Sequence, residues 1–306
     1  MKKELITARE PKSPISEQFR ILRTNIQFMN TKSGLKSVLV TSTSPSEGKS
    51  WTSSNLATTF AQAGKKVVLV DCDMRKGRLF SIFGVSPVPG LSNYLSGINH
   101  NGEASDNDII NYIKPTEIEN LYVLPAGSVP PNPSELLVSE MMANMMKQLE
   151  KLCDIVIYDG TPTNLVTDAL IISRNVDTTL IVCAYKETKM DELEKVKNNI
   201  LNVGGKIAGV VINKMPMQQK EYYSSYYYGS SEKSGINKKT ARTASSLNLE
   251  ARTRASVESN RTNSANKETK KTEIKNDNNI SPAELLNQMN SYIEKKKKSL
   301  RNGDNE

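Results

Sequence analysis

Short apolar runs alternate, along the first 217 residues, with stretches whose apolar residues recur at helical spacing. Six of the runs have the length and apolar character of buried strands: "KSVLV", "VVLVDCD", "LYVLPAG", "CDIVIYDG", "TTLIVCAY" and "KIAGVVIN". Strands that are apolar on both faces and alternate with helices are typical of parallel sheets with helices on each side. The pattern therefore predicts an α/β fold with a mostly parallel sheet flanked by helices.

The start of the chain predicts an arm followed by a helix. Residues 1–15 are polar and contain two prolines, as expected for an arm. The stretch Ser16 to Met29 has apolar residues at helical spacing, with Ser16 as a plausible N-cap: Phe19, Leu22, Ile26 and Met29. A second helix is predicted from Trp51 to its stop at Gly64.

The composition changes after Met217. A long stretch rich in Ser, Thr, Asn and Lys has no apolar period, which predicts a disordered linker. The segment "SPAELLNQMNSYIEKKKK" then has a capping box and one apolar face, so a short helix is expected that docks a partner, lies on a membrane or packs on the domain. The predicted segments are an arm and oligomerisation helix at 1–33, a P-loop domain at 34–220, a tyrosine cluster at 221–230, a disordered linker at 231–280 and an amphipathic helix at 281–300.

Charge and cysteine content bear on the partners and the cellular location of the protein. The net charge is +8, and the residues from 231 to 306 hold 16 Lys/Arg against 10 Asp/Glu, so most of the basicity lies in the tail. An anionic surface as partner and simple solvation of a disordered tail explain this equally well. The three cysteines, Cys72, Cys153 and Cys183, have no CxxC spacing, and His100 is the single histidine. We expect reduced, buried thiols and a cytoplasmic protein, since no apolar run approaches the roughly 18 residues of a membrane span or forms a signal peptide.

The stretch "TSPSEGKS" indicates a phosphate-binding loop. It fits G-x-x-x-x-G-K-[ST] except at Thr43, and it lies between an apolar strand and a helix, as the motif requires. The backbone amides of Glu47, Gly48, Lys49 and Ser50 are expected to point at the phosphates of a nucleotide. Lys49 would reach the β- and γ-phosphates, and the Ser50 hydroxyl would be a ligand of Mg²⁺.

Three carboxylates follow predicted strands. Asp71 and Asp73 alternate at the end of "VVLVDCD", so both side chains can face one site. Asp159 ends the strand of "CDIVIYDG", the position of a Walker-B carboxylate. Ligands of open parallel sheets bind at the carboxyl ends of the strands. A single Asp after a strand is usually a cap, but three beside a Gly-Lys-Ser loop predict binding of phosphate and Mg²⁺.

In these motifs the chain resembles the bacterial tyrosine autokinases of the CpsD/CapB family, P-loop proteins related to partition-type ATPases. The resemblance spans about residues 14–228. It rests on "EQFRILR", "TSPSEGKS", "VVLVDCDMRKGRL", "LPAGSVPPNPSELL", "DIVIYDGTPTNLVTDA", "GVVIN" and the tyrosine run. It implies an ATP- and Mg²⁺-dependent protein-tyrosine kinase in the service of capsular or exopolysaccharide synthesis, and the chain has no H-R-D or D-F-G set of eukaryotic kinases.

The resemblance also assigns roles to residues. Lys49 and Asp71 would take part in catalysis, with Asp71 the candidate base for the tyrosine hydroxyl. Asp73 and Asp159 would hold or orient Mg²⁺ and complete the catalytic set. Trp51 and Asn213 would add to the nucleotide site, Asn213 as a candidate contact of the base.

The run "EYYSSYYYGS" holds five of the eleven tyrosines of the chain. By the resemblance these are sites of autophosphorylation: Tyr222, Tyr223, Tyr226, Tyr227 and Tyr228. Five phosphotyrosines would add about −8 to −10 charges near pH 7. The alternative is an aromatic loop that packs on the domain.

Partners follow from the resemblance as well. Glu17, Arg20 and Arg23 would form a subunit contact in a homo-oligomer, such as a ring, whereas the alternative is i,i+3 pairing within one helix. A membrane-bound activator, whose cytoplasmic tail belongs to a polysaccharide co-polymerase, would recruit the kinase to the inner face of the membrane. A cognate tyrosine phosphatase is implied, and no nucleic acid is expected.

Three residues depart from the family pattern. Ser46 stands where the family usually has glycine, "DGTPT" replaces the usual D-T-P-P and so brings in Gly160, and Trp51 is bulky for the first helical turn. Two other functions therefore stay open. A partition-type ATPase switch usually has a second lysine early in the loop, where this chain has Ser44; a non-catalytic, nucleotide-gated scaffold is the other.

Overall fold

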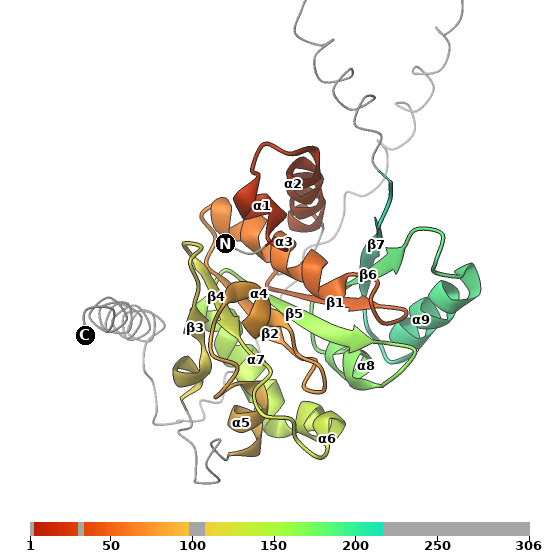
Figure 1. Ribbon diagram of the computed structural model, residues 1–306. Coiled ribbons are helices and arrows are strands. Elements are labelled where there is room, and N and C mark those ends of the chain that lie inside the picture. Colours follow the sequence, from red (N-terminus) through yellow and green to blue (C-terminus); the bar gives the residue numbers. More distant parts are fainter. Residues whose placement is uncertain (1–2, 30–33, 98–107, 217–306) are drawn as a thin grey trace, which may run out of the picture. The chain divides into compact units, whose positions relative to one another are not determined.

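The computed structural model describes residues 3–29, 34–97 and 108–216 (Figure 1). The tyrosine cluster at 221–230, the predicted linker at 231–280 and the predicted helix at 281–300 lie outside the described residues. None of the described helices is both long enough and apolar enough to cross a membrane.

A single seven-stranded sheet organises the described part of the chain, in the order β3-β4-β2-β5-β1-β6-β7. All neighbouring strands are parallel except β3 and β4. The strands are β1 (Ser37–Ser42), β2 (Val67–Asp71), β3 (Lys114–Pro115), β4 (Leu121–Leu124), β5 (Ile155–Pro162), β6 (Thr178–Ala184) and β7 (Ile207–Asn213). The predicted α/β fold with a mostly parallel sheet is confirmed. All six predicted strands are present, and the two-residue β3 was not predicted because it is too short to carry a pattern.

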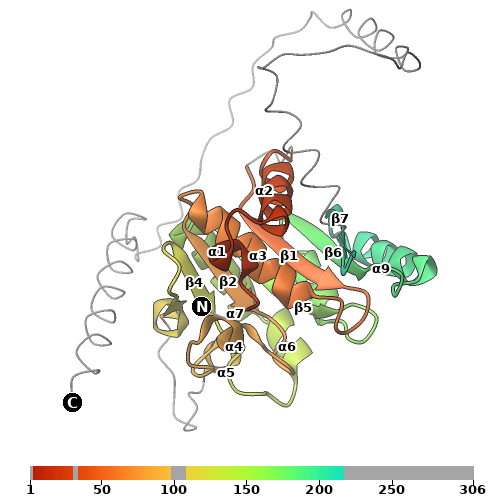
Figure 2. The ribbon, with the colours of Figure 1, turned by 45° about the horizontal axis from the view of Figure 1, so that its top comes forward.

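Helices cover both faces of this sheet, as Figures 1 and 2 show from two directions. The helices are α1 (Ile6–Arg9), α2 (Pro14–Gln27), α3 (Lys49–Gln62), α4 (Leu79–Phe83), α5 (Leu91–Ser96), the 3₁₀ helix η1 (Ile109–Tyr112), α6 (Pro133–Val138), α7 (Glu140–Leu152), α8 (Asp168–Ser173) and α9 (Met190–Asn202). In β2, Val68 and Val70 pack into the core with α5 and α7, whereas Val67 and Leu69 pack into the core with α2 and α3. This alternation follows from the two-residue period of a strand and explains why the strand is apolar throughout.

The N-terminal segment differs from the predicted arm. Leu5 and Ile6 belong to the core on the α3 side of the sheet. The backbone N–H of Thr7 donates to Asn55 Oδ1 of α3 over 3.1 Å. Helix α2 begins at Pro14, and its N-cap is Ser13 rather than Ser16. The polar composition of residues 1–15 therefore hides a short apolar segment, Leu5 and Ile6, which is buried because it packs in the core with α3.

Candidate active site

The strand order brings three distant segments to one edge of the sheet. Strand β1, which leads into the phosphate loop, lies between β5 and β6. Across β2 and β5, Asp71 is the register partner of Asp159. On the other side of β5, Asp159 is paired with Val40 of β1. The predicted loop and the predicted carboxylates thus meet at the carboxyl ends of neighbouring parallel strands, where such folds bind ligands.

The phosphate loop has a backbone that favours glycine at two positions. Gly48, the residue before α3, has φ +97°, and a Cβ added there would lie 2.0 Å from Asn213 Nδ2. Ser46 has φ +66°, a left-handed conformation that is costly for a residue with a Cβ. The loop ends at the N-terminus of the 14-residue α3, where free backbone N–H groups favour an anion.

The side chain of Glu47 braces the loop from inside. Its carboxylate accepts hydrogen bonds from Thr43 Oγ1 over 2.6 Å and from Ser44 N over 2.8 Å. The hydroxyl of Thr188, which precedes α9, donates to the same carboxylate. Only the backbone of Glu47 is therefore left for a ligand. Thr188 is 141 residues away in the chain, and nothing in its local sequence signals this contact.

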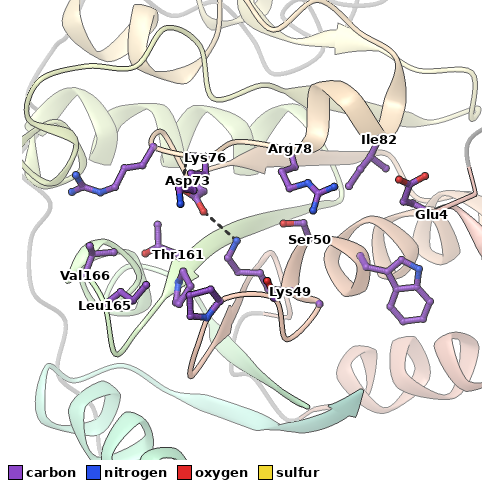
Figure 3. Close-up of a pocket in the computed structure, with 16 residues that line it drawn as sticks. Glu4, Lys49, Ser50, Asp73, Lys76, Arg78, Ile82, Thr161, Leu165 and Val166 are labelled. Carbon is purple, nitrogen blue, oxygen red and sulfur yellow. Dashed lines mark hydrogen bonds and ion pairs between the residues drawn. The ribbon is translucent and has the colours of Figure 1, made fainter. Parts of the chain in front are cut away.

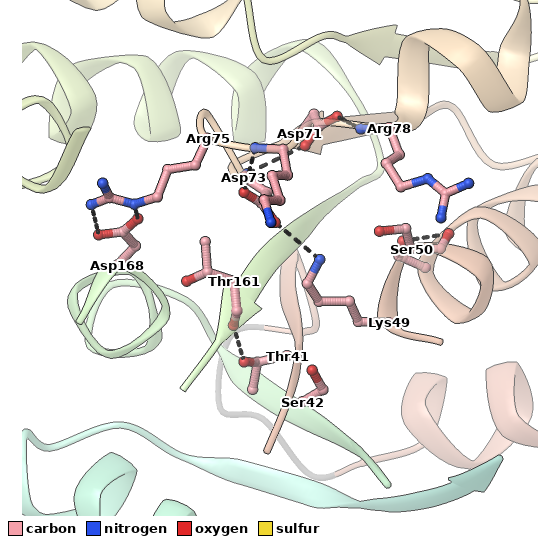
Figure 4. A network of polar contacts seen from close by, with 12 residues as sticks. Thr41, Ser42, Lys49, Ser50, Asp71, Asp73, Arg75, Arg78, Thr161 and Asp168 are labelled. Carbon is pink, nitrogen blue, oxygen red and sulfur yellow. Dashed lines mark hydrogen bonds and ion pairs between the residues drawn. The ribbon is translucent and has the colours of Figure 1, made fainter. Parts of the chain in front are cut away.

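Lys49 is held between carboxylates. Its Nζ lies 3.2 Å from Asp73 Oδ2 (Figure 4). Burial alone would lower the pKa of Lys49, but the charges of Asp159 and Asp73 outweigh it and the net shift of the pKa is upward. Lys49 thus stays a cation at the point where the loop would present it to phosphates.

Asp159 is fully buried, and neither of its oxygens has a hydrogen-bond partner among the described residues. Burial raises the pKa of this carboxyl, while Lys49 and the nearby hydroxyls of Ser50 and Ser53 act against the rise. Buried carboxylate oxygens without partners are unusual and point to a missing ligand.

The oxygen donors at this point fit a magnesium ion. Asp159, Asp73 and the Ser50 hydroxyl offer only oxygen, which Mg²⁺ prefers. Within the described ranges, no group of three or more His, Cys, Asp or Glu side chains could hold a metal. A usual Mg²⁺ site has one or two carboxylates and takes its other ligands from phosphates and water.

The carboxylate of Asp71 is directed toward backbone N–H groups of the turn that follows β2. Its Oδ2 accepts from Arg78 N over 2.9 Å and from Leu79 N over 3.0 Å, and its Oδ1 accepts from Asp73 N over 3.2 Å. Burial, and next the charge of Asp159, raises the pKa of Asp71 to about 7. The carboxylate therefore holds the turn that carries Asp73 and is fully buried itself.

A pocket of about 470 Å³ opens above Lys49 (Figure 3). Its walls combine the phosphate loop, the start of α3, the turn after β2, the end of β5 and the residues that follow it with one residue before α1 and one residue of α4: Glu4, Pro45, Ser46, Gly48, Lys49, Ser50, Trp51, Asp73, Arg75, Lys76, Arg78, Ile82, Thr161, Pro162, Leu165 and Val166.

The turn after β2 is anchored by a contact that sequence reasoning missed. Arg75 Nε lies 3.3 Å from Asp168 Oδ2, and the Ser134 hydroxyl donates to Asp168 Oδ1 over 2.6 Å. Asp168 is fully buried at the start of α8. Arg75 and Asp168 lie within the quoted motifs, but nothing in their local pattern pairs them.

Trp51 and Asn213 both lie beside the loop. Asn213 Nδ2 donates to the backbone carbonyl of Glu47 over 2.8 Å. The ring of Trp51 packs edge-on against Phe19 of α2, with centroids 5.1 Å apart, which accommodates its bulk. Both residues line a second groove, of about 620 Å³, between α2 and the end of β7. The two predicted nucleotide contacts therefore share one groove next to the phosphate loop.

The three residues predicted for subunit contact are engaged within the chain. Arg20 pairs with Glu17 over 2.5 Å, the i,i+3 alternative. Arg23 Nη1 donates to Thr59 O of α3 over 2.9 Å, so it ties α2 to the domain. No partner chain is present, and the subunit contact stays a prediction.

Gly160 is packed too closely to carry a side chain. A Cβ there would lie 2.9 Å from Leu39 Cδ1 and 3.3 Å from Val40 O. We expect Gly160→Ala to destabilise the fold by about 1–3 kcal/mol, because neighbouring atoms must move to admit the methyl group. Thermal unfolding should show a fall in Tm of about 2–4 °C per kcal/mol. A Tm within 1 °C of the parent would contradict the packing argument.

Comparison with known proteins agrees with this geometry. The AAA domain family AAA_31 matches residues 36–209. A protein of Staphylococcus aureus named putative tyrosine-protein kinase CapB is 42% identical over 220 residues, which cover 72% of this chain and 92% of that protein. The crystal structure of the chimerical protein CapA2B2 has a TM-score of 0.65 at 40% identity and covers 71% of this chain and 92% of that one. The kinase domain of Escherichia coli tyrosine kinase ETK has a TM-score of 0.63 at 30% identity, with 70% and 82% covered.

Proposed function

Because the chain belongs to the family of bacterial tyrosine-protein kinases, a group of P-loop proteins with the AAA domain, we propose that it is a protein-tyrosine kinase that uses ATP and Mg²⁺. One observation of this structure supports the proposal independently of the family match. At the end of the phosphate loop, the Lys49–Asp73 ion pair lies beside the buried, unpartnered carboxylate of Asp159. This set has the charges that phosphoryl transfer requires.

The phosphate loop and the groove beside it would bind ATP. The backbone amides from Glu47 to Ser50 and the N-terminus of α3 would hold the phosphates, with Lys49 on the β- and γ-phosphates. The base would lie toward Trp51 and Asn213, in the groove that both residues line. When bound to Ser50, Asp73 and Asp159, Mg²⁺ would neutralise charge on the phosphate oxygens.

In the reaction, the hydroxyl oxygen of a tyrosine forms a bond to the γ-phosphorus, while the bond from this phosphorus to the β–γ bridging oxygen breaks and ADP leaves. The proton of the phenol, whose unperturbed pKa is about 10, passes to a carboxylate. Glu4 and Asp73 are the carboxylates that line the pocket, whereas Asp71 is engaged by three backbone N–H groups. In this conformation Asp71 acts as a positioning residue, and a role as base requires that it release Arg78 and Leu79.

The acceptor that we propose is the chain's own tyrosine cluster, Tyr222, Tyr223, Tyr226, Tyr227 and Tyr228. The cluster lies outside the described residues, so its reach is argued from the sequence alone. The chain leaves the described part at Pro216, six residues before Tyr222, and Pro216 lines the groove beside the phosphate loop. Such phosphorylation would regulate capsular or exopolysaccharide synthesis. It would take place in a ring of subunits that an activator brings to the membrane. A phosphatase would reverse it.

Phosphopeptide mass spectrometry of the purified full chain tests this function. With ATP and MgCl₂ we expect phosphate on the residues Tyr222–Tyr228, and with EDTA none, since Mg²⁺ is required. A matched variant with all five tyrosines changed to Phe should lose the label but still phosphorylate an added peptide of sequence EYYSSYYYGS.

The same experiment separates the alternatives. ATP hydrolysis without phosphotyrosine, also in the presence of the activator's cytoplasmic tail, would favour an ATPase switch. Nucleotide binding with neither activity would favour a scaffold.

A further inference from the structure

Thr161 lines the pocket that also contains Lys49 and Asp73. It follows Asp159 by two residues in β5, at a point where the register with β1 shifts, and the intervening Gly160 faces Leu39 and Ala169. Figure 3 shows Thr161 at the floor of the pocket, next to Lys49 and Asp73.

The residue is fixed, but its hydroxyl group is not used by the protein. The backbone carbonyl of Thr161 accepts from Thr41 Oγ1 over 2.7 Å (Figure 4), and Thr41 also bonds to the hydroxyl of Thr163 over 2.9 Å. Thr161 is only 1% exposed, and its Oγ1 has no hydrogen-bond partner among the described residues. A buried hydroxyl without a partner is costly, which points to a ligand that completes it.

The surroundings of Thr161 indicate the chemistry of that ligand. Pro45 and Ser46 of the phosphate loop line the same pocket, and the ammonium of Lys49 is close by. The ammonium of Lys49 suits an anion with several acceptor oxygens. We propose that Thr161 Oγ1 donates a hydrogen bond to an oxygen of the terminal phosphoryl group of bound ATP. The inference rests on the proposed function and adds a residue that distinguishes ATP from ADP.

The test compares nucleotide binding in Thr161→Val, which keeps the shape and removes the hydroxyl, with Thr161→Ser, which keeps the hydroxyl. Dissociation constants are measured by calorimetry on the full chain with MgCl₂, for a non-hydrolysable ATP analogue and for ADP. We expect Thr161→Val to bind the ATP analogue about tenfold more weakly and ADP within twofold of the parent, since a hydrogen bond to a charged group is worth at least this factor. Thr161→Ser should resemble the parent. Without nucleotide, Thr161→Val should unfold at a higher temperature than the parent, because a buried hydroxyl without a partner is gone.

Equal weakening of both nucleotides, or of neither, would overturn the inference. So would a change limited to the KM of an acceptor peptide, because the hydroxyl would then contact the tyrosine. Failure of the parent itself to bind the ATP analogue would refute the proposed function. Binding by the parent with an unchanged ATP-to-ADP ratio in Thr161→Val would refute only the role of Thr161.

Discussion

Lys49→Met should lower tyrosine phosphorylation by about 10²–10³-fold, the loss seen when a preorganised charge is removed from a developing anion. The ammonium of Lys49 is held by Asp73 and kept charged by Asp159 at the end of the phosphate loop. Methionine has a similar length but supplies no charge. The measurement is the initial rate of phosphate incorporation into tyrosine at saturating MgCl₂, quantified by mass spectrometry.

The control for this variant must separate chemistry from folding. Without Lys49, the two nearby carboxylates lose their cation, which destabilises a buried site. Lys49→Arg keeps the charge, so its Tm should remain closer to that of the parent. Its activity should still fall, because the planar guanidinium does not replace a compact ammonium. Activity of Lys49→Met within tenfold of the parent would argue against phosphoryl transfer at this loop.

Asp159→Asn should separate stability from activity. The fully buried carboxylate has no hydrogen-bond partner among the described residues, and burial of a carboxylate without hydrogen bonds costs free energy that the nearby charge of Lys49 only partly offsets. We expect the neutral variant to be more stable by about 1–2 kcal/mol without nucleotide, with a Tm higher by about 2–4 °C per kcal/mol. Its kinase activity should fall by about 10²–10³-fold, since a negative oxygen beside Ser50 is lost. Thermal unfolding in EDTA and the phosphorylation rate with MgCl₂ measure the two effects.

Asp168 offers a matched control, because it is buried to the same degree but fully engaged. Arg75 and Ser134 both bond to its carboxylate. Asp168→Asn should therefore lower the Tm, since it weakens an existing ion pair. If both Asn variants shifted the Tm in the same direction, the unpartnered state of Asp159 would not be the cause.

Features that depend on consecutive or regularly spaced residues could be predicted from the sequence. The six main strands were found because each is apolar on both faces, and the phosphate loop was found because its residues are consecutive. The spacing of Asp71 and Asp73 indicated two carboxylates at one strand end. The spacing did not indicate that the two carboxylates have different roles, because the role of Asp71 depends on the hydrogen bonds that it accepts from the backbone N–H groups of Arg78 and Leu79.

Near the start of the chain, contacts with distant residues decide what is buried. Residues 1–15 have a polar composition, yet Leu5 and Ile6 are buried because α3 offers an apolar surface to cover them. Arg23 donates to Thr59 of its own chain, a contact that its local sequence does not signal, and its predicted subunit contact stays a prediction. In both cases the decisive neighbour lies more than 30 residues away.

The sequence by itself determined the class of fold, the phosphate loop and the three carboxylates, because periodicity and short motifs depend only on neighbouring residues. The tertiary structure decided which of these groups meet and which are satisfied. The strand order set Asp71 beside Asp159, the contact with Thr188 turned Glu47 inward, and the packing around β5 left the Thr161 hydroxyl buried without a partner among the described residues. A hydrogen bond needs its atoms about 3 Å apart, and only the packed chain brings residues more than a hundred positions apart to that distance.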